Sequence, residues 1–140
     1  MSKGVQNHFR MIIDSDLKEI QRVEEFTEEL VEKIGFSEED KDSLAISITE
    51  MVGNAISHGN RQDKRKKVEI NFYINKKGIR ITIQDEGKGF NVDEVDNPLA
   101  PENLLKDSGR GIYIVRTLMD KVNYIHNKKG TLVEIIKNFN

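Results

Sequence analysis

The chain has 140 residues, a length that suits one domain with one hydrophobic core. Its formal net charge of −2 argues against general electrostatic binding to nucleic acid, and the absence of cysteine excludes both a disulfide framework and a thiolate metal site. Charged residues make up 33% of the chain, but the hydrophobic residues fall in periodic blocks, so we expect a folded domain rather than a disordered chain.

The N-terminal part of the chain predicts one strand and two helices. Residues 8–14 alternate enough to form a first strand. Residues 17–34 carry apolar side chains at helical spacing, and Gly35 is a typical helix stop. The capping-box pattern SEED, which begins at Ser37, predicts a second helix over about 38–58.

The central part predicts a hairpin followed by a long loop. Residues 61–67 (RQDKRKK) read as a charged, solvated turn, with a partner contact as the alternative. Residues 68–74 and 79–84 alternate as strands, joined by the turn sequence NKKG. From 85 to 108 the pattern stops, and loops of this length are uncommon in compact domains unless they bind a ligand or form a lid.

The C-terminal part predicts a helix and a second hairpin. Residues 109–122 begin with glycines and continue as an apolar helix, and 122–127 and 131–139 are the strands that follow. Hairpin-joined strands with helices grouped between them predict an α+β fold in one domain over 1–140. We expect a two-layer sandwich with a mixed sheet covered on one face by about three helices, rather than a doubly wound parallel sheet.

Polar residues recur at spacings of four along the second predicted helix, at Glu50, Asn54 and His58. At about 100° per residue they share one face, together with Ser43 and Ser47. This stripe borders the apolar stripe instead of lying opposite it, so we expect it to line the edge of a pocket whose floor is the core. Taken alone, ordinary surface residues on an amphipathic helix would give the same pattern.

Two glycine-rich stretches follow. In DEGKGF, Asp85 ends a strand, and Gly87 and Gly89 allow the backbone to approach a ligand closely, although a simple turn has the same composition. The stretch SGRGI (108–112) opens a helix, where free N–H groups and the helix dipole favour a phosphate; a helix cap is the alternative. The chain has neither a Walker A motif nor a dinucleotide-binding fingerprint.

In this order, the three stretches resemble the ATP-binding (Bergerat) fold of gyrase, Hsp90, histidine kinases and MutL, and especially the bacterial anti-sigma factors that are serine-protein kinases. SITEMVGNAISHGN is similar to the N-box of that family, DEGKGF to its first glycine box and SGRGIYIVRTLMDKV to its second. The resemblance covers nearly the whole chain. Two positions depart from the pattern: Gly53 stands where Thr or a similar residue is usual, and Asp107 where some relatives carry a basic residue.

The resemblance implies a role for each matching position. Glu50 would be the general base, Asn54 a Mg²⁺ ligand, and Asp85 the acceptor for the adenine amino group. The other nucleotide-binding residues implied are Gly87, Gly89, Lys106, Gly109, Arg110 and Gly111. Lys106 or Arg110 would supply the cation at the terminal phosphate, and residues from about 90 to 108 would form a lid. The role of His58 is either structural or catalytic.

The function that the resemblance implies is that of an anti-sigma factor and kinase. The protein would bind a sigma factor and use ATP and Mg²⁺ to phosphorylate an anti-anti-sigma (STAS-type) protein on serine. It would be a cytoplasmic homodimer without direct contact with nucleic acid or membrane. Two alternatives are a nucleotide-gated partner-binding module without phosphotransfer and the ATP-binding domain of a histidine kinase. The second is less favoured because few residues precede the first predicted helix, where such kinases carry a helical hairpin with the acceptor histidine.

Overall fold

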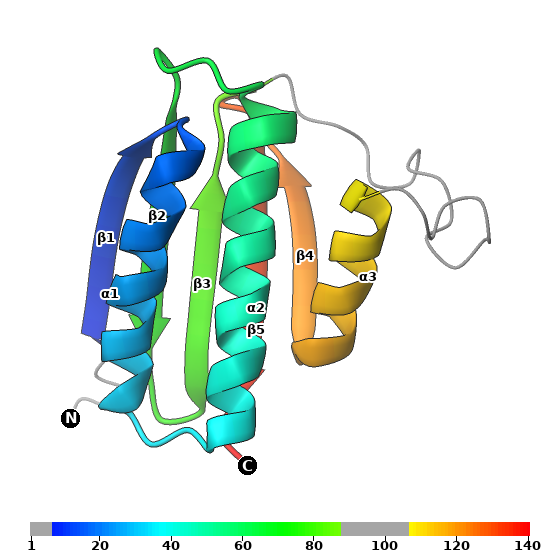
Figure 1. Cartoon of the computed structure of the whole chain (residues 1–140). Coiled ribbons are helices and arrows are strands. Elements are labelled where there is room, and N and C mark those ends of the chain that lie inside the picture. The colour runs from blue at the N-terminus through cyan, green and yellow to red at the C-terminus, as the bar shows by residue number, and fades with distance from the viewer. Residues whose placement is uncertain (1–6, 88–106) are drawn as a thin grey trace.

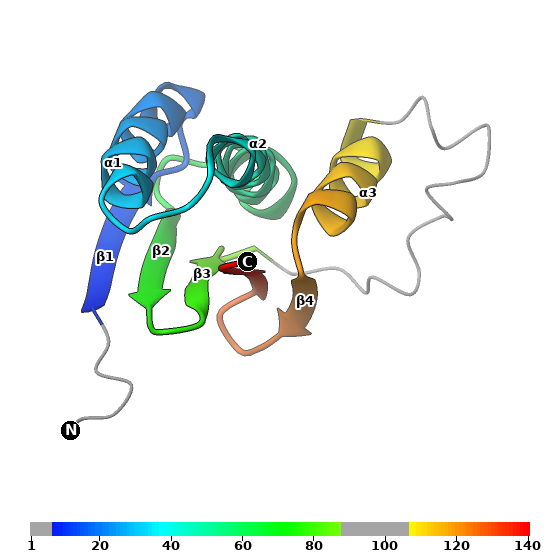
Figure 2. The same cartoon turned by 90° about the horizontal axis from the view of Figure 1, so that it is seen from below.

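The protein is a two-layer sandwich of one sheet and one layer of helices (Figures 1 and 2). The computed structural model describes residues 7–87 and 107–140, with backbone alone for 107–110. The strands are β1 (Asn7–Asp14), β2 (Lys67–Ile74), β3 (Gly78–Gln84), β4 (Lys121–His126) and β5 (Thr131–Asn138). The helices are the 3₁₀ turn η1 (Leu17–Glu19), α1 (Ile20–Glu32), α2 (Glu38–Asn54), the π-helical turn η2 (Ala55–Gly59) and α3 (Asp107–Leu118).

The strand order is β1-β2-β3-β5-β4, and each neighbouring pair is antiparallel. The α+β sandwich is therefore confirmed, but the expectation of a mixed sheet is wrong. The reason lies in the last hairpin. Because β5 turns back from β4 and pairs with β3, it separates the two strands that run in the same direction.

The core lies between the sheet and the three helices, which cover one face only (Figure 2). Alternation in β2 and β3 places one residue in two on this face, where the buried apolar residues are Val68, Ile70, Phe72, Ile74, Ile79, Ile81 and Ile83. From α2, Leu44, Ile48, Met51 and Val52 fill the space above the sheet. This packing fixes the rotation of α2 about its axis, and with it the direction of the polar stripe.

A ladder of polar contacts crosses the other face of the sheet, with one side chain from each strand. The ring of His8 stacks on Tyr73 at 4.5 Å, and the Arg80 guanidinium lies 4.6 Å from the centre of the Tyr73 ring. Arg80 also pairs with Glu134, which accepts a 2.8 Å hydrogen bond from Asn123 Nδ2. The bond from Arg80, followed by that from Asn123, lowers the pKa of Glu134 below its usual value. A polar face of this kind is typical of an antiparallel sheet that is covered on one side.

Two predicted helix ends differ from the structure. The second predicted helix, 38–58, is α-helical only to Asn54 and then widens into the π turn η2. The third, 109–122, is helical over 107–118, because Val122 pairs with Ile135 in the sheet instead of continuing the helix. The lid expected over 90–108 lies almost wholly outside the described residues. In the part of the chain that the structure describes, no helix combines the length and apolarity needed to cross a membrane.

Candidate functional site

A pocket of about 410 Å³ lies between α2 and α3 at the end of α2. Glu50 and Asn54 line it from α2, His58 from η2, and Gly111 and Ile114 from α3. A Cβ atom placed on Gly111 would lie 2.3 Å from Glu50 Oε1 and 3.8 Å from Asn54 Nδ2. The structure therefore brings the acid and the amide of α2 into direct proximity with the second glycine-rich stretch.

The polar stripe of α2 divides into two parts. Its last turns reach the pocket, but Ser43 and Ser47 are buried, with 7% and 0% of their surfaces exposed. The expectation that these two serines line the pocket edge is therefore wrong. The hydroxyl of Ser47 has no hydrogen-bond partner among the described residues. Both serines belong to the packed part of the helix, and of the predicted stripe Glu50, Asn54 and His58 line the pocket.

The end of α2 is a π turn, so regular helical spacing does not extend to His58. The N–H of Asn60 donates to Ala55 O at 2.8 Å, and that of Gln62 donates to Ile56 O at 2.7 Å. Arg61 and Gln62 then take left-handed φ values of 54° and 57°. His58 remains exposed on this turn and lines the pocket beside Asn54. Single π turns of this kind often occur at functional sites.

Asp85 lies immediately after β3 and is 4% exposed. Its Oδ1 accepts hydrogen bonds from the N–H groups of Thr131, at 2.9 Å, and Gly87, at 3.1 Å. Its own N–H donates to Thr131 O at 3.0 Å. The carboxylate is therefore held in one orientation by the backbone of two segments, and Oδ2 keeps its capacity to accept a hydrogen bond.

Three glycines surround Asp85 closely. A Cβ on Gly59 would lie 2.0 Å from Asp85 Oδ2, and a Cβ on Gly130 would lie 2.4 Å from Oδ1. A Cβ on Gly87 would lie 1.9 Å from the carbonyl oxygen of Gly59. Contacts this short leave room for hydrogen alone, so a side chain at any of these glycines would displace Asp85 or its segment. Gly87, predicted from the sequence as a nucleotide-binding residue, is thus needed for close packing against the backbone of Gly59.

A small hollow between α2 and the sheet connects Asp85 to Asn54. It is lined by Met51, Asn54, Ala55, Ile83, Asp85, Tyr124, Thr131 and Val133. The Tyr124 hydroxyl contacts the Met51 sulfur at 3.5 Å, and burial raises the pKa of Tyr124 to about 12. Most of this hollow is apolar, with the Asp85 carboxylate at its end, and at about 20 Å³ it has room for little more than one water molecule in this conformation.

The remaining predicted site residues are placed only in part. Gly89 and Lys106 lie outside the described residues, and Gly109 and Arg110 belong to the first turn of α3, where the backbone alone is described. Sequence reasoning missed Gly59, Gly130 and Thr131. Gly59 directly follows His58 in the N-box, and Gly130 has the composition of a hairpin turn, so neither indicates by itself that it packs against Asp85.

The comparisons with known proteins identify the family. The model of the histidine kinase-like ATPase domain matches residues 13–137, and the chain belongs to this family. The chain is 29% identical over 114 residues to serine-protein kinase RsbW of Bacillus subtilis strain 168, covering 77% of this chain and 71% of that protein. It is 42% identical over 95 residues to the anti-sigma F factor of Anoxybacillus flavithermus, covering 64% of each chain. The resemblance predicted from the sequence motifs is thus confirmed.

A solved structure shares the fold. It contains the RsbU and RsbW domains of a Mycobacterium tuberculosis protein and aligns with a TM-score of 0.68 at 17% identity. The alignment covers 94% of this chain but 32% of that one. At this identity the likeness extends to the arrangement of helices and strands alone.

Proposed function

We propose that this protein is an ATP-dependent serine-protein kinase that acts as an anti-sigma factor. It would bind a sigma factor and phosphorylate a STAS-type anti-anti-sigma protein on serine, in the cytoplasm. The family and the names of the relatives support this proposal. The observation that carries it is the placement of Glu50 and Asn54, one helical turn apart, on the pocket wall that faces Gly111.

The residues present fit a magnesium nucleotide. Asn54 offers a neutral amide oxygen, a ligand suited to Mg²⁺ when phosphate oxygens and waters complete the coordination. No cluster of three or more His, Cys, Asp or Glu residues that could hold a metal occurs in 7–87 and 107–140, so the nucleotide itself would have to supply most ligands. Gly111 leaves open the space beside Glu50 and Asn54 that a Cβ would fill. When bound, the magnesium nucleotide supplies the transferable phosphoryl group and neutralises its charge.

Glu50 is the proposed general base. Glu50 is half-buried and lines the pocket with Asn54 and His58, and its carboxylate would accept a proton from a serine hydroxyl that enters the pocket. General-base catalysis of this kind contributes about 10²–10⁴-fold to the rate. His58, exposed on the same pocket wall, is free to contact the incoming protein, whereas the buried carboxylate of Asp85 faces the hollow behind Asn54.

Asp85 is the proposed adenine-recognition residue. Its Oδ1 is already occupied by two backbone donors, which leaves Oδ2 to accept a hydrogen bond from the exocyclic amino group of the base. A guanine base presents a carbonyl oxygen at that place, which would face a carboxylate without a proton between them. The fixed carboxylate would therefore select adenine over guanine.

The test is a transfer assay with the protein, Mg-ATP and a STAS-type substrate protein. We expect phosphoserine on the substrate with wild-type protein. We expect Glu50→Gln to reduce the transfer rate by about 10²-fold or more, with ATP affinity retained because the amide has the same shape. Equal transfer by Glu50→Gln would refute the role of Glu50. ATP binding that changes partner affinity without any phosphoprotein would favour the nucleotide-gated module instead.

Homodimerisation remains part of the proposal. Strand β1 is at the edge of the sheet, and it exposes Phe9 and Ile12 with 38% and 46% of their surfaces accessible. Exposed edges with apolar side chains favour association with another chain. Sedimentation velocity of the wild-type protein, alone and with Mg-ATP, would give the oligomeric state directly.

A further inference from the structure

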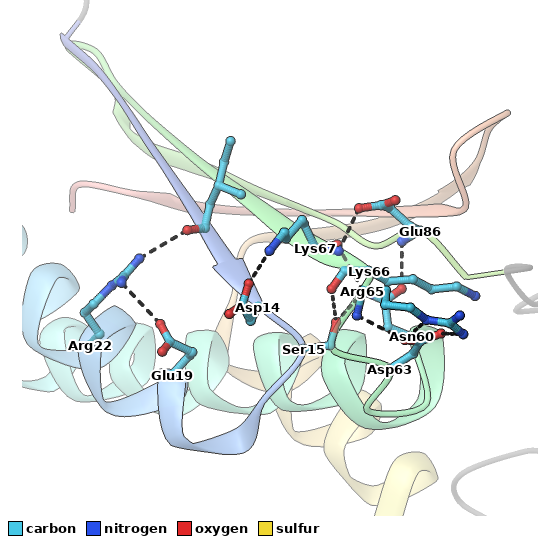
Figure 3. Close-up of polar contacts among 11 residues, drawn as sticks. Asp14, Ser15, Glu19, Arg22, Asn60, Asp63, Arg65, Lys66, Lys67 and Glu86 are labelled. Carbon is cyan, nitrogen blue, oxygen red and sulfur yellow. Dashed lines mark hydrogen bonds and ion pairs between the residues drawn. The ribbon is translucent and has the colours of Figure 1, made fainter.

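Asn60, which follows the π turn η2, lies at the junction of four segments (Figure 3). It is 1% exposed. Its Nδ2 donates to Ser15 Oγ at 2.8 Å and to the carbonyl oxygen of Lys67 at 3.0 Å, and its Oδ1 accepts from the N–H of Glu86 at 2.8 Å. The side-chain amide therefore uses both donors and its acceptor, and it connects the end of β1, the start of β2 and the segment after β3.

The π turn is the reason that Asn60 is buried. The hydrogen bond from Asn60 N–H to Ala55 O spans five residues instead of four, so the turn contains one extra residue. In a regular α-helix each residue advances by about 100°, and removal of that extra residue would rotate Asn60 away from Ser15 and Glu86. The rare π turn thus occurs together with an Asn60 side chain whose hydrogen bonds are all made. This combination indicates that the fold requires the Asn60 amide at this place.

The partner that matters for the site is Glu86, the residue next to Asp85. Glu86 is attached twice, because its N–H donates to Asn60 Oδ1 and its Oε2 accepts from the N–H of Lys67 at 2.7 Å. On the opposite side, Thr131 holds the Asp85 carboxylate through its N–H. Asp85 is therefore fixed from the sheet by Thr131 and from the end of η2 by Asn60.

We propose that Asn60 is a positioning residue for base recognition, which fixes Asp85 through the N–H of Glu86. Asn60 acts through the chain and does not touch the nucleotide itself. This inference rests on the proposed function, since it requires Asp85 to bind the adenine amino group. It differs from a purely structural role because it predicts a loss of base discrimination as well as a loss of stability.

The experiment compares the affinity for ATP with that for purine riboside triphosphate, which lacks the 6-amino group. Both are titrated with Mg²⁺ in a calorimeter against wild type, Asn60→Ala and Ser15→Ala. We expect wild type to bind ATP about tenfold or more tightly than the analogue, and Asn60→Ala to lose most of that preference. Ser15→Ala is the matched control, because it removes one hydrogen bond of Asn60 but leaves the bond to Glu86 in place.

Each outcome decides the inference. Retained preference in Asn60→Ala, with only a lower melting temperature, overturns it, as does an equal loss of preference in Ser15→Ala. If wild type binds ATP but shows no preference over the analogue, the assignment of Asp85 fails and the inference falls with it. If wild type does not bind ATP, the proposed function itself fails. Should Asn60→Ala not fold, Asn60→Ser replaces it. The serine hydroxyl is too short to reach the Glu86 N–H, and the space that the amide leaves can be filled by a water molecule.

Discussion

A methyl group added at Gly111 should slow phosphoryl transfer without lowering the stability of the fold. Gly111 lies inside α3, where Ala is favoured over Gly by about 0.5–1 kcal/mol. The added Cβ would lie 2.3 Å from Glu50 Oε1, a distance that real Cβ contacts essentially never show. Because the obstructing atom is the end of a flexible side chain, the Glu50 carboxylate moves and the helices stay in place.

The distance that Glu50 Oε1 must move sets the expected loss of transfer rate. Ordinary van der Waals contact with an oxygen begins near 3.4 Å, so Oε1 moves by about 1 Å. A misplacement of about 1 Å in a reacting group costs on the order of 10²-fold in rate. We therefore expect Gly111→Ala to transfer phosphate about 10²-fold more slowly while its melting temperature is unchanged or rises by about 2–4 °C.

Gly53→Ala is the matched control. Gly53 is also inside a helix, α2, but a Cβ there would meet only Ile20 Cδ1, at 3.7 Å, which is an ordinary contact. We expect the same small gain in stability with transfer kept within a factor of a few of wild type. The two proteins are compared by calorimetric melting and by single-turnover phosphorylation. Unimpaired transfer by Gly111→Ala would refute the reasoning, since the base would then tolerate the methyl group or would not be Glu50.

Two further substitutions test the packing and the electrostatics away from the site. Ser47→Ala removes a buried hydroxyl that has no hydrogen-bond partner among the described residues. The free energy of unfolding, measured by urea titration, should therefore stay equal or rise by up to about 1 kcal/mol. A clear loss of stability would contradict this prediction. The second concerns Glu134, whose pKa Arg80 lowers from 4.5, so the carboxylate stabilises the fold above that pH and loses this effect as the pH falls. Glu134→Gln should lower the melting temperature near pH 7 and have a progressively smaller effect as the pH falls below 4.5, and an effect that does not change with pH would count against the ladder.

The sandwich was predictable because its signals are local. Strict alternation in β2 and β3 marks the face that carries the core, and the capping pattern at Ser37 marks the start of α2, where Ser37 Oγ accepts from Asp40 N–H at 3.1 Å. The antiparallel order was not predictable from such patterns. It depends on which side of β4 the last strand takes, and the alternation of β5 is the same in either arrangement.

The candidate site also has residues that local spacing predicts and residues that it does not. Glu50 and Asn54 are visible as a pair because one helical turn separates them, and Asp85 is visible because it follows a strand. The π turn has no signature in AISHG, and it is favoured only when Asn60 finds partners 45 residues earlier, at Ser15, and 26 residues later, at Glu86. Contacts of this range arise from the assembled fold, so a single sequence does not report them.

The three glycines around Asp85 also restrict which acid can stand there. Gly59 and Gly130 each leave room for hydrogen alone against the two carboxylate oxygens, and the N–H groups of Thr131 and Gly87 fix the depth at which Oδ1 lies. A glutamate would carry the same charge on one more methylene, and the backbones of Gly59 and Gly130 leave no room for that extra length on their side of the carboxylate. At this position the length of the side chain is therefore a stricter requirement than its charge, because the surrounding backbone accepts an aspartate.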